Sequence, residues 1–255
     1  FDVETVKKKF NSEGCESGLI GWSRKPCAFT GTRVRIPPPP PFNIMSEEYQ
    51  TTKESYDKHV DEYVKNTYHT TPPPINEFIQ SLPGNAKVVD IGCGPGRDSN
   101  AFIKAGIDYL GIDFSGATIE KARELNPNAS FIVEDFKKLD FKKESVDAFW
   151  AIASLYHLSR ADFKEVIKQL YGFLKEGGQM FIVMKKGTGE HFNEDLRYSS
   201  GKKFISLYEL EELEAIYKEV GFSIKEIFVV EKNEVNTHLE NEYENRGVVV
   251  AWLIK

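Results

Sequence analysis

Closely spaced glycines and an acidic residue follow a short apolar run, a pattern that can bind a ligand. Residues 86–91 (AKVVDI) are typical of a buried strand, and Asp90 precedes Gly92, Gly94 and Gly96. Glycines after a strand allow positive φ and let a ligand approach the backbone closely. We therefore expect a nucleoside-type ligand at this turn.

A second acidic residue fits the same ligand. Asp113 follows the next predicted strand, where a carboxylate can accept hydrogen bonds from both ribose hydroxyls. A dinucleotide loop would read G-x-G-x-x-G and hold a pyrophosphate at a helix N-terminus, whereas this loop reads G-x-G-x-G. Asp90 would repel a pyrophosphate and attract the ammonium of an amino acid. The pattern therefore favours S-adenosylmethionine (SAM) over NAD.

Around these residues, four segments resemble the class I SAM-dependent methyltransferases, namely residues 88–96, 111–115, 134–136 and 174–178. The resemblance extends over about residues 50–255. It implies a three-layer, Rossmann-like α/β fold with a seven-stranded, mostly parallel sheet, an antiparallel last strand, and helices on both faces. The order of predicted strands and helices independently favours a parallel sheet.

The resemblance also implies roles for particular residues. The glycine loop contacts the methionine part of SAM, Asp113 holds the ribose, and Asp135 faces the adenine amino group with the Phe136 backbone nearby. Tyr56, in the run Ser-Tyr-Asp, reaches the methionine carboxylate. Cys93 within the loop is expected to be a small buried residue. The complete predicted cofactor-binding set is Asp90, Gly92, Cys93, Gly94, Gly96, Asp113, Phe114, Asp135, Phe136, Ala151 and Tyr56.

Candidate catalytic residues follow the fourth predicted strand. Tyr156 and His157 come at the edge of the sheet where α/β folds bind ligands. His157 can act as a general base or play a structural role, because SAM is activated enough for positioning alone to suffice. The spacing of His157, His191 and nearby acids matches no metal-binding motif, so no metal site is expected.

The remaining elements position these residues. A helical cap is expected over residues 45–84, with a helix beginning at Thr51 or Thr52, before the methyltransferase domain at 85–255. Capping boxes at Ser159 and Ser206 predict two helices, and Gly177-Gly178 is expected to end the first. Residues 185–206 are expected to form a long functional loop. The predicted strands cover residues 86–91, 109–112, 130–133, 146–151, 180–184, 222–230 and 248–254, the last two antiparallel.

Residues 1–44 differ from the rest of the sequence. They lack a helical or strand period and end in a run of prolines, which is typical of an extended spacer. We expect a disordered or non-native extension, with Met45 as the natural start. Three cysteines in poor disulfide spacing, and no signal or membrane segment, favour a cytoplasmic protein.

Composition guides the prediction of the methyl acceptor. The formal net charge is −6 and no basic stripe is visible, so a small molecule is expected and a nucleic acid is disfavoured, with locally bound RNA and protein acceptors as open alternatives. Segments 151–158, 185–187 and 197–198 resemble small bacterial methyltransferases of the small-molecule type, many without an assigned substrate. A non-catalytic SAM-binding protein and a nicotinamide-dependent oxidoreductase remain as alternatives. The sequence predicts neither the methylated atom nor the oligomeric state.

Overall fold

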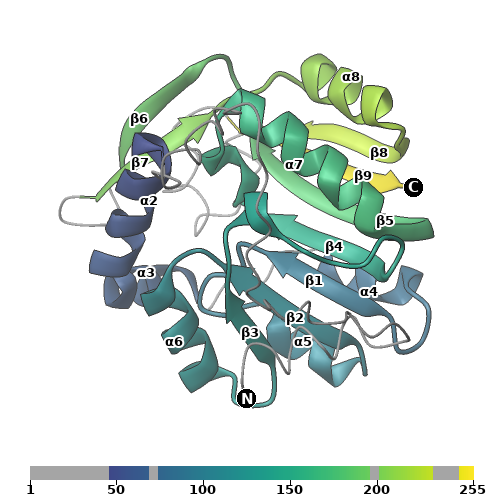
Figure 1. The fold of residues 1–255 in the computed structure, drawn as a ribbon, viewed down its shortest axis with the longest axis horizontal. Coiled ribbons are helices and arrows are strands. Elements are labelled where there is room, and N and C mark those ends of the chain that lie inside the picture. The colour runs from purple at the N-terminus through teal and green to yellow at the C-terminus, as the bar shows by residue number, and fades with distance from the viewer. Residues whose placement is uncertain (1–45, 69–73, 196–200, 232–246) are drawn as a thin grey trace, which may run out of the picture.

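A seven-stranded sheet forms the centre of the protein (Figure 1). The computed structural model describes residues 46–68, 74–195, 201–231 and 247–255, so the expectations for residues 1–44 and for Arg197-Tyr198 lie outside it. The strand order is β3-β2-β1-β4-β5-β9-β8. The strands are β1 (Lys87–Ile91), β2 (Asp108–Asp113), β3 (Ser130–Val133), β4 (Val146–Ile152), β5 (Leu174–Lys185), β8 (Ser223–Val230) and β9 (Val248–Ile254).

The pairing of the strands confirms the predicted fold class. The strands β1 to β5 pair in parallel, whereas β9 runs antiparallel to both β5 and β8. Because parallel strands end at one edge of a sheet, the turns after β1, β2, β3 and β4 come together there. These turns carry the glycine loop, Asp113, Asp135 and His157.

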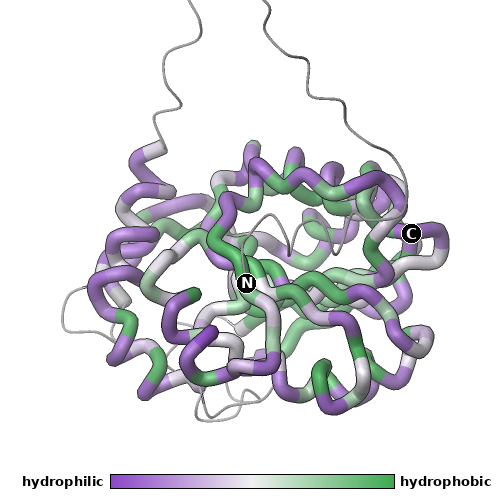
Figure 2. The backbone as a smooth tube through the Cα atoms, turned by 60° about the horizontal axis from the view of Figure 1, so that its bottom comes forward, coloured by the Kyte–Doolittle hydropathy of each residue, from purple (hydrophilic) through white to green (hydrophobic). Residues whose placement is uncertain are grey.

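Helices cover both faces of the sheet, and side-chain alternation along the strands fills two cores. In β4, Phe149 belongs to the core beneath the helices α7 (Arg160–Phe173) and α8 (Leu210–Val220). Its neighbour Trp150 belongs to the core beneath α4 (Ile75–Ser81), α5 (Ser99–Lys104) and α6 (Gly116–Leu125). Figure 2 shows the apolar strands inside and polar positions on the outer helices. A sheet covered on both faces explains why its strands read as nearly continuous apolar runs.

Several element boundaries differ from the predicted ones. Helix α2 (Glu47–Lys58) begins before Thr51 and Thr52, and α3 (Val60–Thr67) is separate from it. The predicted cap at Ser159 is confirmed, since its side chain accepts a hydrogen bond from the Asp162 N–H. Ser206 instead donates to the Leu158 carbonyl, and α8 starts after Glu209. Gly177-Gly178 lies within β5, since α7 already ends at Phe173.

The connection expected to be an irregular loop contains a β-hairpin, β6 (Glu190–Asp195) with β7 (Gly201–Ser206). Helix α2 lies beside this hairpin in Figure 1. The Phe204 N–H of β7 donates to the Thr52 hydroxyl of α2 at 2.9 Å. Helix α2 also contacts α6, because Asp57 of α2 accepts a hydrogen bond from Ser115 at the start of α6. Two segments far apart in the sequence therefore cover the same end of the sheet.

Among the described helices, none has the length and hydrophobicity needed to cross a membrane.

Candidate cofactor and acceptor site

The glycine loop and Asp113 are held together by backbone hydrogen bonds. The N–H groups of Gly92 and Cys93 both donate to the carbonyl of Ile112 in β2, at 2.8 and 3.0 Å. The Gly94 N–H donates to one Asp113 oxygen at 3.1 Å, and the Ser115 N–H to the other at 2.9 Å. Each carboxylate oxygen keeps a further lone pair for a ligand. The backbone therefore holds the Asp113 carboxylate in a defined position beside the glycine loop, and its ribose role stays a prediction.

Burial affects the ionisation of Asp113. The side chain is 7% exposed, and burial, partly offset by the Ser115 and Gly94 N–H groups, raises the pKa of Asp113 to about 6. The carboxylate is therefore charged at neutral pH and close to its titration range.

A small polar cavity borders the glycine loop. Its lining includes Asp90, Tyr63 and Asp98, and Arg97 also lines it and forms an ion pair with Asp98. Asp90 accepts a hydrogen bond from the Tyr109 hydroxyl at 2.7 Å, and Asp98 accepts one from the Trp150 indole at 2.9 Å. Burial and the charge of Asp98 raise the pKa of Asp90 well above its usual range. A cation placed beside these acids would stabilise their charged forms, as expected for the SAM ammonium.

The turn after β3 holds the residues predicted to meet the adenine. Asp135 accepts a hydrogen bond from the Lys137 N–H and so begins the short helix η1 (Phe136–Lys138). Phe136 lies edge-on to Phe114, with ring centroids 5.9 Å apart. Both rings are buried. The turn therefore brings an aromatic pair and a carboxylate together beside Asp113.

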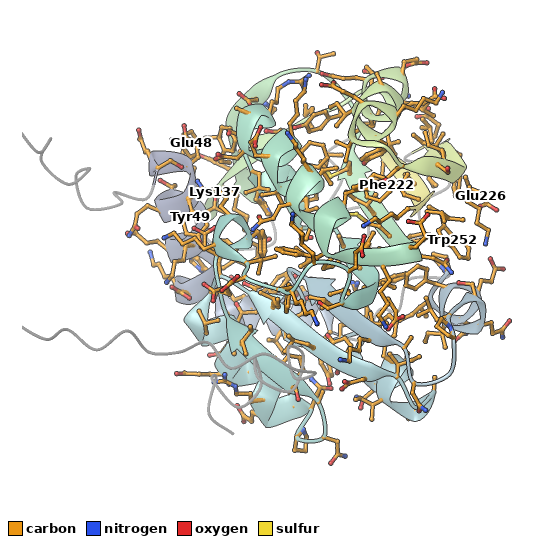
Figure 3. The ribbon with its side chains drawn as sticks, turned by 45° about the vertical axis from the view of Figure 1, so that its right-hand side comes forward. Glu48, Tyr49, Lys137, Phe222, Glu226 and Trp252 are labelled. Carbon is orange, nitrogen blue, oxygen red and sulfur yellow. The ribbon has the colours of Figure 1, made fainter. Side chains whose placement is uncertain are left out.

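Tyr49 is a site residue that sequence reasoning missed. It reaches this turn from α2, with its ring 5.0 Å from that of Phe114, and Figure 3 shows it beside Lys137. Burial, followed by the charges of Asp135 and Asp113, raises the pKa of the Tyr49 hydroxyl. Tyr49 therefore lies over the predicted adenosine position. No signal in the sequence distinguishes it from any other helical tyrosine.

Replacing Tyr49 by leucine is expected to weaken SAM binding roughly 3- to 10-fold, because an aromatic contact contributes about 0.5–1.5 kcal/mol beyond its buried area. Isothermal titration calorimetry with SAM measures the change. The control is Gln50→Ala, which alters an exposed position one residue further along α2. Equal affinities for the two variants would remove Tyr49 from the site.

Ala151 and Cys93 belong to the predicted cofactor-binding set, but their side chains pack in the two cores. Ala151 is fully buried, and its side chain belongs to the core under α7 and α8. Its successors, Ile152 and Ala153, line the cavity instead, and Ala153 has a positive φ of 57°. Such a conformation is costly for a residue with a Cβ and is concentrated at functional sites. Cys93 is buried as expected, and burial raises the pKa of its thiol, which disfavours a nucleophilic role.

His157 forms hydrogen bonds with both segments that cover this end of the sheet, helix α2 and the β6–β7 hairpin. It ends the short helix η2 (Leu155–His157) after β4. Its Nδ1 lies 2.7 Å from the Phe204 carbonyl of β7, and its Nε2 lies 3.0 Å from the Tyr56 hydroxyl of α2. Because a carbonyl only accepts hydrogen bonds, Nδ1 of His157 carries a proton and donates to it, while Nε2 shares a hydrogen bond with the Tyr56 hydroxyl. The predicted residues Tyr56 and His157 therefore meet.

Two buried lysines beside these residues were also missed. Lys203 of β7 is 2% exposed, and its Nζ lies 3.5 Å from the centroid of the Tyr56 ring. Lys185 at the end of β5 is 8% exposed, and its Nζ lies 5.0 Å from the centroid of the Tyr156 ring. Lysine is almost always exposed, so no sequence pattern predicts this burial.

Comparisons with known proteins identify the class. A family model described as a methyltransferase domain matches residues 88–178. The tRNA (carboxymethyluridine(34)-5-O)-methyltransferase of Mus musculus is 28% identical over 239 residues, 87% of this chain and 35% of that protein. The tRNA (carboxymethyluridine(34)-5-O)-methyltransferase of Saccharomyces cerevisiae is 28% identical over 142 residues, 55% of this chain and 50% of that protein. The chain thus spans between about a third and a half of these relatives.

A solved structure of a SAM-dependent methyltransferase from Methanosarcina mazei has the same fold. Its TM-score is 0.62 at 20% identity, covering 72% of this chain and 98% of that one. The family model, the relatives and the fold confirm the prediction from the sequence. Residues 88–178 therefore form a methyltransferase domain with the fold of SAM-dependent methyltransferases, and the cofactor is SAM.

The prediction of a small-molecule methyl acceptor is wrong. A small molecule was expected and a nucleic acid was considered unlikely, yet the relatives described above are tRNA methyltransferases. The net charge of the whole chain was the wrong criterion for the acceptor, because an acidic chain can still bind an anionic polymer through a local group of cations.

Proposed function

We propose that this protein transfers the methyl group of SAM to a tRNA nucleoside. The observation that carries the proposal is the extent of the match to the mouse tRNA methyltransferase, 87% of this chain. The family model alone matches only residues 88–178. The longer match therefore also takes in much of the chain outside the cofactor-binding strands, where α2 and the β6–β7 hairpin cover the site.

The geometry supports direct in-line displacement at the sulfonium. Asp90 near the end of β1 could bind the SAM ammonium, and Asp113 at the end of β2 could bind the ribose. The Tyr109 hydroxyl holds Asp90, and the Gly94 and Ser115 N–H groups hold Asp113. Tyr56, Tyr156 and His157 lie at the same edge of the sheet. Holding donor and acceptor in line supplies much of the rate enhancement for an activated methyl donor.

Local cations support an RNA acceptor. Lys137 and Lys138 lie in the turn after β3, and Lys186 follows β5. The hairpin adds Lys202, which is exposed. Lys137 and Lys186 form partly exposed ion pairs with Asp162 and Glu231, so an RNA phosphate would have to compete with these carboxylates. Binding through these residues should weaken as salt is raised.

The test is transfer of label from [methyl-³H]SAM by the full chain. The acceptors are tRNA from a strain of the source organism that lacks this gene, a protein extract, and a low-molecular-weight extract of the same cells. We expect label in the tRNA fraction that ribonuclease releases from the precipitate, and much less transfer by Asp113→Ala when SAM is kept below the Kd of that variant. Label in another fraction would overturn the tRNA acceptor, and no transfer to any fraction would overturn methyl transfer itself.

A further inference from the structure

The side-chain amide of Asn126, directly after α6, makes all four hydrogen bonds that such a group can form. The residue is 2% exposed. Its Nδ2 donates to the Pro95 carbonyl at 3.0 Å and to the Ala122 carbonyl at 3.1 Å. Its Oδ1 accepts from the Tyr68 hydroxyl and from the Asn100 amide, both at 2.9 Å. Because carbonyls only accept hydrogen bonds, these partners fix which side of the amide faces the glycine loop.

Pro95 lies between the second and third glycines of the loop and lines the polar cavity that also contains Asp90. Asn126 holds its carbonyl. On the other side of the same peptide bond, the Gly96 N–H donates to the Cys93 carbonyl at 3.0 Å. A peptide bond is planar, so these two hydrogen bonds together fix the orientation of the peptide. Asn126 therefore stabilises the shape of the loop where the amino-acid part of SAM is expected to bind.

The approach of Asn126 to the loop also explains the third glycine. Gly96 has a φ of 76°, and a Cβ there would lie 2.7 Å from Nδ2 of Asn126 and 2.6 Å from the ring of Phe131. Any other residue at this position would push the amide away from the Pro95 carbonyl. The last glycine of the G-x-G-x-G pattern is thus matched to an asparagine from a different part of the chain.

The opposite side of the Asn126 amide holds helix α3. Tyr68 directly follows this helix, which lies beside α6 in Figure 1. Tyr63 and Thr67 of α3 line the cavity, and a Cβ on Gly94 would lie 3.2 Å from the Tyr63 hydroxyl. The Tyr68 hydroxyl therefore attaches the helix that lies over the glycine loop to the same residue that holds the loop.

We propose that Asn126 is a positioning residue for the amino-acid part of SAM, and that it joins α3 to the glycine loop through Tyr68 and Pro95. It acts through the loop and the helix and not by touching the reacting atoms. A loop that is already held in its binding conformation loses less conformational entropy when the ligand binds. The inference rests on SAM as the cofactor and on the predicted place of its amino-acid part, and not on tRNA as the acceptor.

Two ligands that differ in the amino-acid part test the proposal. S-adenosylhomocysteine carries this part, and 5′-methylthioadenosine lacks it. Asn126→Ala in the full chain is expected to weaken binding of S-adenosylhomocysteine roughly 5- to 30-fold, because the freed loop must be ordered again when the ligand binds. Binding of 5′-methylthioadenosine should stay unchanged. Calorimetric titration measures both affinities, and Asn128→Ala, at an exposed position two residues further along, is the matched control.

The comparison of the two ligands separates positioning from a general structural role. A residue that only supports the fold would affect both ligands to the same extent when it is removed. An equal loss of affinity for both ligands would therefore overturn the proposal, and so would an unchanged affinity of Asn126→Ala for S-adenosylhomocysteine.

Tyr68→Phe tests the same link even if Asn126→Ala does not fold, because it removes a single hydroxyl. Its control is Asn100→Ala, which removes the other donor to the same Oδ1 atom but lies in α5. We expect affinity for S-adenosylhomocysteine to fall about 2- to 12-fold in Tyr68→Phe, the effect of one lost hydrogen bond, and to change little in Asn100→Ala. Binding of 5′-methylthioadenosine should change in neither variant. Equal affinities of the two variants for S-adenosylhomocysteine would overturn the link between α3 and the loop.

Discussion

Replacing Asp113 by alanine is expected to weaken SAM binding about 10- to 150-fold, or about 1.5–3 kcal/mol, the typical contribution of charge-assisted hydrogen bonds. The carboxylate is buried and held in place by the Gly94 and Ser115 N–H groups. Calorimetric titration with SAM and S-adenosylhomocysteine measures the loss.

The matched control is Asp108→Ala at the opposite end of β2, away from the glycine loop. This variant should bind SAM with unchanged affinity. Should a folded Asp113→Ala variant bind SAM normally, the carboxylate would have no part in cofactor binding, and the site would have to be reassigned.

The pH dependence of binding follows from the same residue. Burial raises the pKa of Asp113 to about 6, so lowering the pH through 6 protonates the carboxylate and removes its charge. If only the carboxylate form binds the ribose, SAM affinity falls about tenfold between pH 7.5 and pH 5. The Asp113→Asn variant should show a smaller decrease over this range, and any decrease that remains would come from Asp90, whose pKa burial also raises. A flat profile for the unmodified chain would contradict the assignment.

A second large effect is expected for Gly92→Ala, with about 3 kcal/mol lost from the free energy of unfolding. Gly92 has a φ of 73°, and a Cβ there would lie 2.2 Å from the Cβ of Ser154. Ser154 cannot easily yield, because its hydroxyl donates to the Ile91 carbonyl. Left-handed backbone costs an alanine about 1–2 kcal/mol and overpacking costs about 1–3 kcal/mol.

Differential scanning calorimetry measures this loss, which corresponds to a decrease in Tm of about 6–12 °C for a domain of this size. Gly172→Ala is the control. It lies in α7, with no atom within 4 Å of the added Cβ, and should stabilise the helix by about 0.5–1 kcal/mol. If the Gly92→Ala variant had the same Tm as the unmodified chain, the glycine loop would be able to relax around the added Cβ. Contact with Ser154 would then not determine the shape of the loop.

The sheet and the cofactor end of the site were predictable because local patterns determine them. A buried strand in a covered sheet is apolar throughout, and the turns that follow parallel strands share one edge. Asp90, Gly92 and Asp113 could therefore be placed together from strand positions alone, and the structure joins Gly94 to Asp113 through a hydrogen bond.

The positions of α2 and of the β6–β7 hairpin over the site could not be predicted from the sequence. The strand Glu190–Asp195 is mostly polar, because a two-stranded hairpin leaves much of its surface in water, and it lacks the apolar pattern of a core strand. Ser206 has the spacing of a capping box, but its hydroxyl bonds to Leu158. Lys203 and Tyr49 acquire their positions only when α2 and β7 pack together.

The position of β9 has a consequence for the order in which the chain can fold during synthesis. This strand is the last described element, yet it lies between β5 and β8 and pairs with both. Until it has left the ribosome, β5 has an unpaired apolar edge and β8 has no neighbour in the sheet. The glycine loop and the turns after β2 to β4 are complete much earlier. The half of the sheet that binds SAM can therefore form first, and a nascent chain halted before residue 248 would expose an edge prone to aggregation.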